Sequence, residues 1–305
     1  MTLALKTRHL QVFLAVAKAG SMQRGAREAH LTQPAISKLI GELEATLGAP
    51  LFERSRRGVV PTECGRALIG RAELVLNDLA SAKDEIAAIA RGEAGRVRVG
   101  VLPVAEARLL SNTLLALRKT APGLAVQIED GTREVMLNAL RRGEIDCVIG
   151  RLDAGAGDRD LHIEKLIQLP AAIVVSPSHA LARRRRLSWP DLLPYPWILP
   201  QRGGPIRTAI DREFTDQGLA PPLPAIETTS FRLIQAVVTA TDMIGVISYE
   251  ASSAYKRTGE LAVLPIKLSG RLPHIGVVTR TAMGSKALGT FLAALRKECK
   301  SAFQT

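Results

Sequence analysis

The sequence predicts an α/β protein with an N-terminal all-α winged helix-turn-helix domain and a C-terminal α/β domain of two lobes. Three observations support this fold class. Three short amphipathic helical segments and a basic strand-turn-strand segment lie within residues 8–62. An apolar repeat with alternating spacings of four and three follows, to about residue 91. Beyond residue 96, strand and helix patterns alternate, which is typical of a parallel sheet covered by helices.

The first two helices are predicted from apolar spacing and capping residues. Residues 8–19 place apolar side chains at i, i+3, i+4 and i+7, namely Leu10, Phe13, Leu14 and Ala17. Gly20 is suited to end this helix in the left-handed conformation, and Ser21 is a typical N-cap for a second helix over 22–29. Gly25 and Ala26 are small, so another helix can approach the second one closely.

The third helix begins after the cap Thr32, with Pro34 in its first turn, where a missing N–H is harmless. One apolar stripe is expected to face the core: Ile36, Leu39, Ile40, Leu43 and Leu47. The opposite face is small and singly basic, and consists of Pro34, Ser37, Lys38, Gly41 and Ala45. A helix with such a slim face can enter the major groove of DNA.

The chemistry of that face fits DNA. Gln33 and Ser37 can hydrogen-bond to base edges, Pro34 can contact a thymine methyl group, and Lys38 can neutralise a phosphate. An ordinary three-helix cap with a solvated face also fits the helix pattern alone. The segment that follows favours DNA binding, because Leu51–Thr62 is predicted to form a hairpin wing with Arg54, Arg56 and Arg57 near its tip. Arginines placed there suit phosphates or a narrow minor groove, whereas most charged runs are solvated loops.

A long helix is predicted from its N-cap Thr62 to about Arg91. It carries a seam of apolar residues at heptad spacing: Leu68, Ala72, Val75, Leu79, Ala82, Ile86 and Ile89. A single helix facing its own core would show the same pattern. The seam lasts three heptads without a neighbouring partner helix in the sequence, which favours self-association as a dimer, or as a tetramer made of two dimers. The stretch 92–95 is expected to act as a hinge.

The C-terminal part is predicted to form two α/β lobes. Strands at 96–102, 124–129 and 146–149 alternate with helices at 106–119 and 134–142, an order that implies a parallel sheet with right-handed crossovers. A second run has strands at 171–175, 197–199, 225–227 and 243–247, with helices at 206–217 and 231–239. The strand 274–279 and the helix 286–300 come last and are expected to return to the first sheet. Ligands of such sheets bind at the carboxyl ends of strands.

Residues 8–66 resemble the DNA-binding domain of the LysR-type transcriptional regulators. The resemblance rests on the run Gly20–Lys38 and on the later motifs Glu42–Glu44, Leu47-Gly48, Pro50–Arg54 and Thr62–Gly65. Met22, Gly25 and Lys38 depart mildly from the family, which usually has Phe, Ala and Arg there, and Gly25 costs roughly 1 kcal/mol of helix propensity. The predicted DNA-binding residues are Ser21, Arg24, Thr32, Gln33, Pro34, Ser37, Lys38, Arg54, Arg56 and Arg57.

The C-terminal part is also similar to this family, at the turn Gly131-Thr132 and in the run Leu140–Gly150. This resemblance implies a fold like that of a periplasmic solute-binding protein and a small-molecule effector that changes DNA binding. Candidate effector-binding residues follow predicted strands: Leu102, Pro103, Val104, Gly131, Thr132, Arg151, Arg202, Gly203, Gly204, Thr228, Thr229 and Ser230. At the first of these positions relatives often have Ser or Thr.

The hydroxyls, helix N-termini and Arg202 in this set favour an organic anion. Other interpretations stay open for individual residues. Each hydroxyl can simply cap its own helix, Gly203-Gly204 can form a tight turn, and Arg151 can point into the cleft or face solvent.

Several classes of protein are excluded or disfavoured. The three cysteines are far apart, and the sequence contains no P-loop, no paired metal ligands and no Gly-x-Ser-x-Gly motif. We therefore expect no enzymatic activity and no cofactor. No signal peptide and no apolar run of about 18 residues is present, so we expect a cytoplasmic protein without a membrane partner. A net charge of +12 is compatible with double-stranded DNA as a partner.

The predicted domains are residues 1–61 for DNA binding, 62–91 for the connecting and dimerising helix, and 92–305 for effector binding. Within the last, lobe I covers about 95–165 and 268–305, and lobe II about 166–267. The resulting hypothesis is a sequence-specific transcriptional regulator whose activity responds to a small molecule bound between the lobes. The alternative is a solute-binding or enzymatic α/β protein with an incidental helical N-terminus, which has no need for Gln33–Lys38 and an arginine wing.

Overall fold

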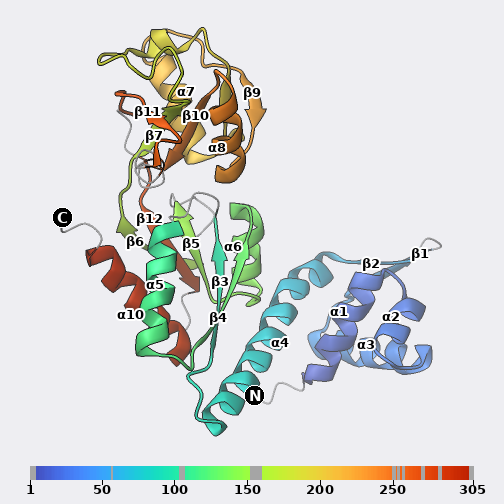
Figure 1. Cartoon of the computed structure of the whole chain (residues 1–305). Helices are drawn as coiled ribbons and strands as arrows, with labels where there is room; N and C mark the ends of the chain where they lie inside the picture. The colour runs from blue at the N-terminus through green and yellow to red at the C-terminus, as the bar shows by residue number, and fades with distance from the viewer. Residues whose placement is uncertain are drawn as a thin grey trace.

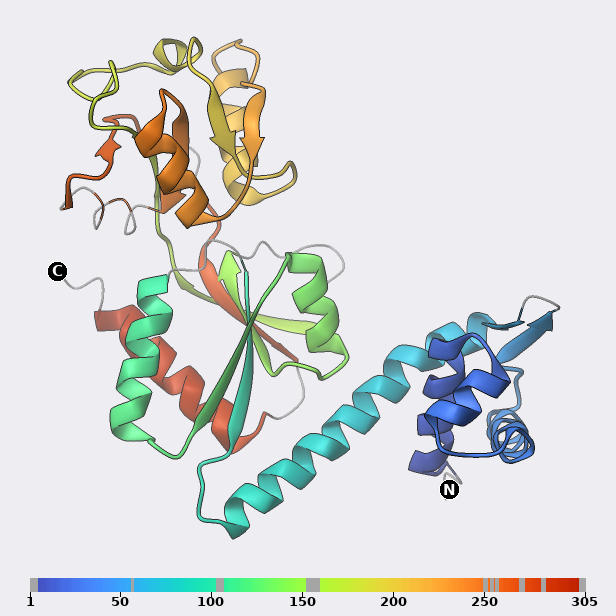
Figure 2. The same cartoon turned by 45° about the vertical axis from the view of Figure 1, so that its right-hand side comes forward.

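The structure is a computed structural model, and it describes residues 5–55, 58–102, 107–151, 160–248, 252, 255, 258–268, 272–280 and 284–301. A helical domain lies at one end of a long helix, α4, and two stacked α/β lobes lie at the other (Figure 1). Figure 2 gives the same arrangement from another side. Four predicted site residues, Pro103, Val104, Arg56 and Arg57, lie outside the described residues.

The three N-terminal helices are α1 (Thr7–Ala19), α2 (Met22–Glu28) and α3 (Gln33–Leu47), and their predicted bounds are confirmed to within one residue. The predicted caps are confirmed as well. Ser21 Oγ accepts a hydrogen bond from the amide of Arg24, and Thr32 Oγ1 accepts one from Ala35, each at 3.4 Å. Gly20 ends α1 with φ 60° and Gly48 ends α3 with φ 69°, both in the left-handed region.

The core of this domain differs from the predicted stripes in two places. On α1, Val12 and Val16 are buried together with Leu10 and Phe13, whereas Leu14 and Ala17 are only partly buried. On α3, Leu47 is 40% exposed and does not belong to the core. Leu47 is the last residue of its helix, so the helical spacing continues beyond the turns that pack against α1 and α2.

Gly25 allows α1 and α2 to approach closely. A Cβ atom added to Gly25 would lie 2.9 Å from the Cα atom of Val16, which is shorter than a van der Waals contact. The predicted close approach is therefore confirmed, and it explains why a residue with poor helix propensity stands within α2.

The predicted wing is confirmed as an antiparallel hairpin of β1 (Phe52–Ser55) and β2 (Gly58–Pro61), in which Arg54 pairs with Val59. The amide of Val59 donates a hydrogen bond of 3.0 Å to the carbonyl of Gly20. A Cβ atom on Gly58 would lie 2.6 Å from the same carbonyl oxygen. The hairpin is therefore held against the turn between α1 and α2.

Glu44 and Thr62 connect the third helix, the wing and the long helix. Glu44 Oε1 accepts hydrogen bonds from the amides of Leu51 and Phe52, at 2.7 and 3.3 Å. Thr62 Oγ1 donates to the carbonyl of Pro50 at 2.7 Å and caps α4 by accepting from the amide of Gly65 at 3.0 Å. These contacts use side chains to satisfy backbone groups that helices and strands leave unpaired at their ends.

The long helix α4 spans Glu63–Ala90, as predicted. Its apolar seam serves two different surfaces. Leu68 and Ala72 pack into the core of the N-terminal domain, and Ala72 is only 1% exposed. The later members of the seam face outward, and Ile86 and Ile89 are 68% and 69% exposed. The start of the seam is thus a core contact, and its later part is an open apolar face.

Lobe I is built on a five-stranded sheet of order β4-β3-β5-β12-β6. The strands β3 (Arg96–Val101), β4 (Ala125–Asp130) and β5 (Cys147–Arg151) are parallel, which confirms the predicted βαβαβ unit. The last strand, β12 (Ile275–Arg280), joins this sheet as expected and runs antiparallel to β5 and to β6 (Leu161–Ile167). The edge strand β6 was not predicted, because His162, Glu164 and Lys165 interrupt its apolar pattern.

Helices cover both faces of this sheet (Figure 2). The helices α5 (Ala107–Thr120) and α10 (Lys286–Ser301) pack on one face, with Leu109, Leu117, Phe291 and Leu295 buried against β3. The helix α6 (Arg133–Arg141) covers the other face through Met136, Leu137 and Leu140.

Lobe II has a second five-stranded sheet of order β11-β7-β10-β8-β9. Its strands are β7 (Ala171–Val175), β8 (Trp197–Leu199), β9 (Pro224–Glu227), β10 (Ile244–Ser248) and the short β11 (Ala262–Val263), of which only β11 was not predicted. The helices are α7 (Pro205–Thr215), α8 (Phe231–Ala240) and a 3-10 turn, η1 (Trp189–Leu192). Helices α7 and α8 bury separate apolar clusters on opposite faces.

Replacing Glu44 with Ala should destabilise the protein. The amides of Leu51, which is 1% exposed, and of Phe52 would lose their acceptor. Each unsatisfied buried donor costs about 1–3 kcal/mol. Urea denaturation followed by circular dichroism measures the loss. Glu53→Ala, an exposed carboxylate on the neighbouring strand, is the matched control, and an equal loss in both variants would contradict the role of Glu44.

Candidate DNA-binding and effector-binding sites

The outward face of α3 has the expected composition. Pro34, Lys38, Gly41 and Ala45 are exposed and Ser37 is half-buried, whereas Ile36 and Ile40 behind them are buried. Gln33, the first residue of the helix, is exposed. The structure thus gives α3 one slim exposed face and one packed face.

Lys38 is the cation of this face, and its side chain is 79% exposed. Its Nζ atom lies 4.0 Å from Glu42 Oε1, one turn further along the helix. Glu42 Oε2 also lies 3.3 Å from Nε2 of the buried His9 on α1. Because an exposed pair at this distance is weak, Lys38 keeps its charge available for a phosphate.

The other predicted DNA-binding residues lie near the same end of the domain. Ser21 and Thr32 are the N-caps of α2 and α3, and Arg24 is exposed in the first turn of α2. Arg54 belongs to β1 of the wing, which the Val59–Gly20 hydrogen bond holds next to Ser21. The start of α2 and the wing are thus joined.

In lobe I the structure brings Leu102, Gly131 and Arg151 together at one edge. These residues follow or end β3, β4 and β5, and the carboxyl ends of parallel strands share an edge. The amide of Leu102 donates to Ile149 O at 2.9 Å, and that of Gly131 to Val101 O at 3.2 Å. Arg151 is 5% exposed and donates through Nη1 to Pro273 O at 3.1 Å, so it does not face bulk solvent.

In lobe II the segments after β8 and β9 also lie side by side. The amide of Thr228 donates to Leu199 O at 3.0 Å, which joins the end of β9 to the end of β8. Gly204 is the N-cap of α7, Gly203 has a φ of 85°, and Arg202 is exposed. The positive φ of Gly203 agrees with a tight turn before α7.

Three of the candidate hydroxyls cap local structure. Thr132 Oγ1 accepts from the amide of Val135, and Ser230 Oγ from that of Leu233, each at 3.4 Å. Thr228 Oγ1 accepts from the amide of Ser230 at 3.1 Å. The capping interpretation is thus correct for these residues, yet a hydroxyl that accepts a bond still has its proton to donate. Capping and anion binding are therefore compatible.

Arg207 is a buried cation at this edge that sequence reasoning missed. It is 1% exposed, and its Nε atom donates to Asp211 Oδ1 at 2.8 Å. Its Nη1 atom lies 3.4 Å from both Pro200 O and Glu227 Oε1. Arg207 thus ties α7 to the ends of β8 and β9. The only sequence signal was its position one turn after Gly203-Gly204, in a helix predicted to start beside the ligand.

The carboxyl ends of β3 and β5 point toward lobe II, and those of β8 and β9 point toward lobe I (Figures 1 and 2). The two sets of candidate residues therefore belong to sheet edges that face each other. The run Arg142–Asp146, by contrast, precedes β5 and lies at the opposite end of the lobe I sheet.

Neither buried cysteine is suited to thiol chemistry. Burial, with a smaller effect of Asp146, raises the pKa of the Cys147 thiol far above its usual range. Burial also raises the pKa of Cys299 to about 11, whereas Cys64 is exposed. No group of three or more potential metal ligands occurs in the described part of the chain. None of the helices described there is long and apolar enough to cross a membrane.

The architecture defines a class of protein, in which a winged helix-turn-helix head is joined by a helix to a two-lobed ligand-sensing domain. Residues 7–66 match the family model described as bacterial regulatory helix-turn-helix protein, lysR family. Residues 90–300 match the LysR substrate binding domain.

Curated relatives match along most of their length. The HTH-type transcriptional regulator PcaQ of Agrobacterium fabrum is 31% identical, over 98% of this chain and 96% of its own. The regulator GbpR of Azospirillum brasilense is 30% identical, over 96% of this chain and 86% of its own. The crystal structure of full-length CbnR with its target DNA has the same fold, with a TM-score of 0.69 at 23% identity, over 96% of this chain and all of that one.

The chain therefore belongs to the LysR family of transcriptional regulators, as the sequence resemblance predicted. It is a sequence-specific DNA-binding regulator with an effector-binding domain of two α/β lobes. The alternative of an incidental helical N-terminus is wrong, because those helices are the family's DNA-binding domain.

The native protein should expose one reactive thiol. Only the thiolate reacts with Ellman's reagent, and burial keeps Cys147 and Cys299 protonated at pH 8. We expect one fast equivalent per chain, its loss in Cys64→Ser, and three equivalents after denaturation. Two or three fast equivalents in the native protein would contradict the burial of these side chains.

Proposed function

We propose that residues 1–61 bind operator DNA, that residues 62–91 connect and dimerise the chain, and that residues 92–305 bind the effector. In this proposal α3 enters the major groove and the wing contacts the flanking backbone or minor groove. The observation that carries the proposal is the slim exposed face of α3 beside the anchored hairpin.

The roles within the DNA-binding set follow from side-chain chemistry. Gln33 and Ser37 read base edges, and Pro34 contacts a thymine methyl group. Lys38, Arg24 and the wing residues Arg54, Arg56 and Arg57 neutralise phosphates or enter the minor groove. The N-caps Ser21 and Thr32 contact the backbone at the helix N-termini, where the dipoles favour anions.

We propose a small organic anion as the effector, bound between the facing edges of the two lobes. Lobe I contributes Arg151, the turn Gly131-Thr132 and the segment Leu102–Val104. Lobe II contributes Arg202–Gly204 and Thr228–Ser230. Two guanidinium groups, several hydroxyl protons and the N-termini of α6, α7 and α8 would together favour a carboxylate. Regulation then rests on binding rather than on catalysis, in the cytoplasm.

The outward apolar part of α4 supports dimerisation. Val75, Leu79, Ile86 and Ile89 are exposed and lie on one side of α4. An apolar seam of heptad spacing gains stability when a second copy covers it. A dimer presents two recognition helices to an interrupted dyad, and two dimers can form a tetramer.

Substitutions on α3 should separate affinity from sequence preference. Lys38→Ala should weaken binding to all duplexes and lower the salt slope by about 1, because one phosphate contact is lost. Gln33→Ala and Ser37→Ala should change base preference, because each lost base contact removes about 1–3 kcal/mol of discrimination against the wrong base. Gel shifts over a salt series, with DNA upstream of the gene, measure both. Lys119→Ala on lobe I is the control, and salt-insensitive binding by the wild type would contradict the proposal.

Arg202 should be needed for effector binding. In a thermal-shift screen of small carboxylates, a bound compound raises the melting temperature of the wild type. Arg202→Ala should lose that shift and keep the unliganded melting temperature, because its side chain is exposed. Arg212→Ala, an exposed arginine within α7, should keep the shift. Equal responses of the two variants would remove Arg202 from the site.

A further inference from the structure

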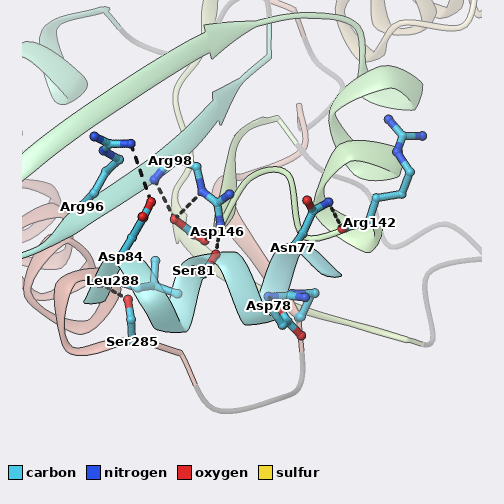
Figure 3. A network of polar contacts seen from close by, with 11 residues as sticks. Asn77, Asp78, Ser81, Asp84, Arg96, Arg98, Arg142, Asp146, Ser285 and Leu288 are labelled. Carbon is cyan, nitrogen blue, oxygen red and sulfur yellow. Dashed lines mark hydrogen bonds and ion pairs between the residues drawn. The ribbon is translucent and has the colours of Figure 1, made fainter. Parts of the chain in front are cut away.

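The connecting helix α4 carries a row of polar side chains that contact lobe I (Figure 3). Asn77 Nδ2 donates to Arg142 O, Ser81 Oγ accepts from Arg98 Nη2, and Asp78 Oδ1 lies next to Arg280 Nη2, each at 2.8 Å. Two longer ion pairs extend the row, Glu73 with Arg142 at 3.8 Å and Asp84 with Arg96 at 4.0 Å. We name this set the α4–lobe I contact.

This contact and the exposed seam lie on different sides of α4. At about 100° per residue, Glu73, Asn77, Ser81 and Asp84 fall roughly opposite the direction of Val75, Leu79, Ala82, Ile86 and Ile89, whereas Asp78 lies at the border of the seam. A second chain can therefore cover the seam while the polar side stays on its own lobe I. The helix can respond to both neighbours at once.

The fit is close at one point. Gly143, in the turn after α6, has a φ of 70°. A Cβ atom added there would lie 3.0 Å from Arg280 Nη1, 3.1 Å from Leu74 Cδ1 and 3.4 Å from Asn77 Cβ. Glycine at this position thus serves the turn and also the approach of α4.

Arg98 is the residue that joins this contact to the sheet. Besides Ser81, it contacts Asp146 at 2.8 Å from Nη2 to Oδ1, and its own amide donates to Asp146 Oδ2 at 2.7 Å. The side chains of Arg98 and Asp146 are 22% and 17% exposed, so their pair is better shielded from solvent than most surface pairs. The amide of Asp146 also donates to Arg98 O at 2.8 Å.

The Arg98–Asp146 pair lies at the opposite end of β3 and β5 from the candidate effector-binding residues. Arg98 lies in β3, which ends at Val101 just before Leu102, and Asp146 precedes β5, which ends at Arg151. Each distance is four or five residues of strand, or about 13–17 Å. A relative shift of β3 and β5 at the effector edge therefore displaces the Arg98–Asp146 pair at the other end, where Ser81 of α4 is bound.

We propose that Arg98 is the positioning residue that transmits the state of lobe I to α4, and that the α4–lobe I contact sets the orientation of the DNA-binding head. This proposal rests on the proposed function of the lobe edges. A contact made mostly of hydrogen bonds and partly exposed ion pairs stabilises one orientation by a small amount, so effector binding can shift the population. A large apolar interface would hold the helix permanently.

Distances within one chain test the proposal directly. Spin labels are attached to the natural Cys64 at the start of α4 and to Lys119→Cys on α5, both exposed, in the full-length protein diluted with unlabelled chains. Pulsed electron paramagnetic resonance should give one narrow distribution of the distance between the two labels, which is called the distance below. Asn77→Ala, Asp78→Asn and Ser81→Ala combined should broaden the distance distribution, whereas Lys83→Ala, exposed on another side of the same helix, should leave it narrow. An unchanged distance in the triple variant overturns the proposal.

Three further variants separate coupling from simple folding defects. Asp78→Arg should broaden the distance, and adding Arg280→Asp should narrow it again, because the swapped pair restores the attraction. Arg98→Lys keeps the charge but loses the planar fork, so it should broaden the distance without changing the urea midpoint of the DNA-binding domain. A failure of the swap to narrow the distance, or a narrow distance in Arg98→Lys, counts against the proposal.

The relay from the effector edge is tested with Arg151→Gln. It should shift the distance in the wild-type background and have no effect once Ser81→Ala is present. Equal effects in both backgrounds, or no effect in either, overturn the relay. Gel shifts on the same samples distinguish the two proposals. If the wild type shows no salt-sensitive DNA binding, that result contradicts the proposed function and not the relay through Arg98.

Discussion

The arrangement of the molecule depends on how α4 divides its surface among the N-terminal domain, lobe I and an exposed apolar seam. Its first turns are capped by Thr62 and bury Ala72 in the N-terminal domain. Further along, one side carries the polar residues that contact lobe I, and the opposite side leaves an apolar seam exposed. Because a helix of 28 residues is about 42 Å long and stiff, any tilt of α4 on lobe I moves the head at its other end.

The second constraint is the direction of the strands. Parallel strands place all their carboxyl ends on one edge, so β3, β4 and β5 gather residues from three separate parts of the chain. The amino-terminal ends of the same strands gather Arg98 and Asp146 against α4. One sheet therefore has a ligand-facing edge and a helix-facing edge, and its strands are the shortest covalent connection between them. Buried apolar side chains on both faces pack these strands closely together.

In the N-terminal domain, one face of α3 has to stay exposed while the domain remains stable. Ile36, Ile40 and Leu43 anchor α3, and the carboxylate of Glu44 holds the start of the wing. The buried side chains and the Glu44 carboxylate both lie on the packed side of α3. The outward face is thus free to carry small and polar residues that suit a DNA groove. Glu42, which also contacts His9, lies beside Lys38 without neutralising it fully.

The sequence was enough to predict the helix starts and ends in the N-terminal domain, the wing and the parallel strands of lobe I. These features depend on caps, glycines and apolar spacing, which act between residues a few positions apart. It also identified the segments after β3, β4, β8 and β9 as candidate ligand contacts, because their position follows from strand direction. Tertiary structure alone decided that Leu47 is exposed, that Leu68 and Ala72 belong to the head, and that Arg207 is buried. It alone paired Asp78 with Arg280 and Ser81 with Arg98, since such contacts join residues far apart in the chain and leave no periodic signal.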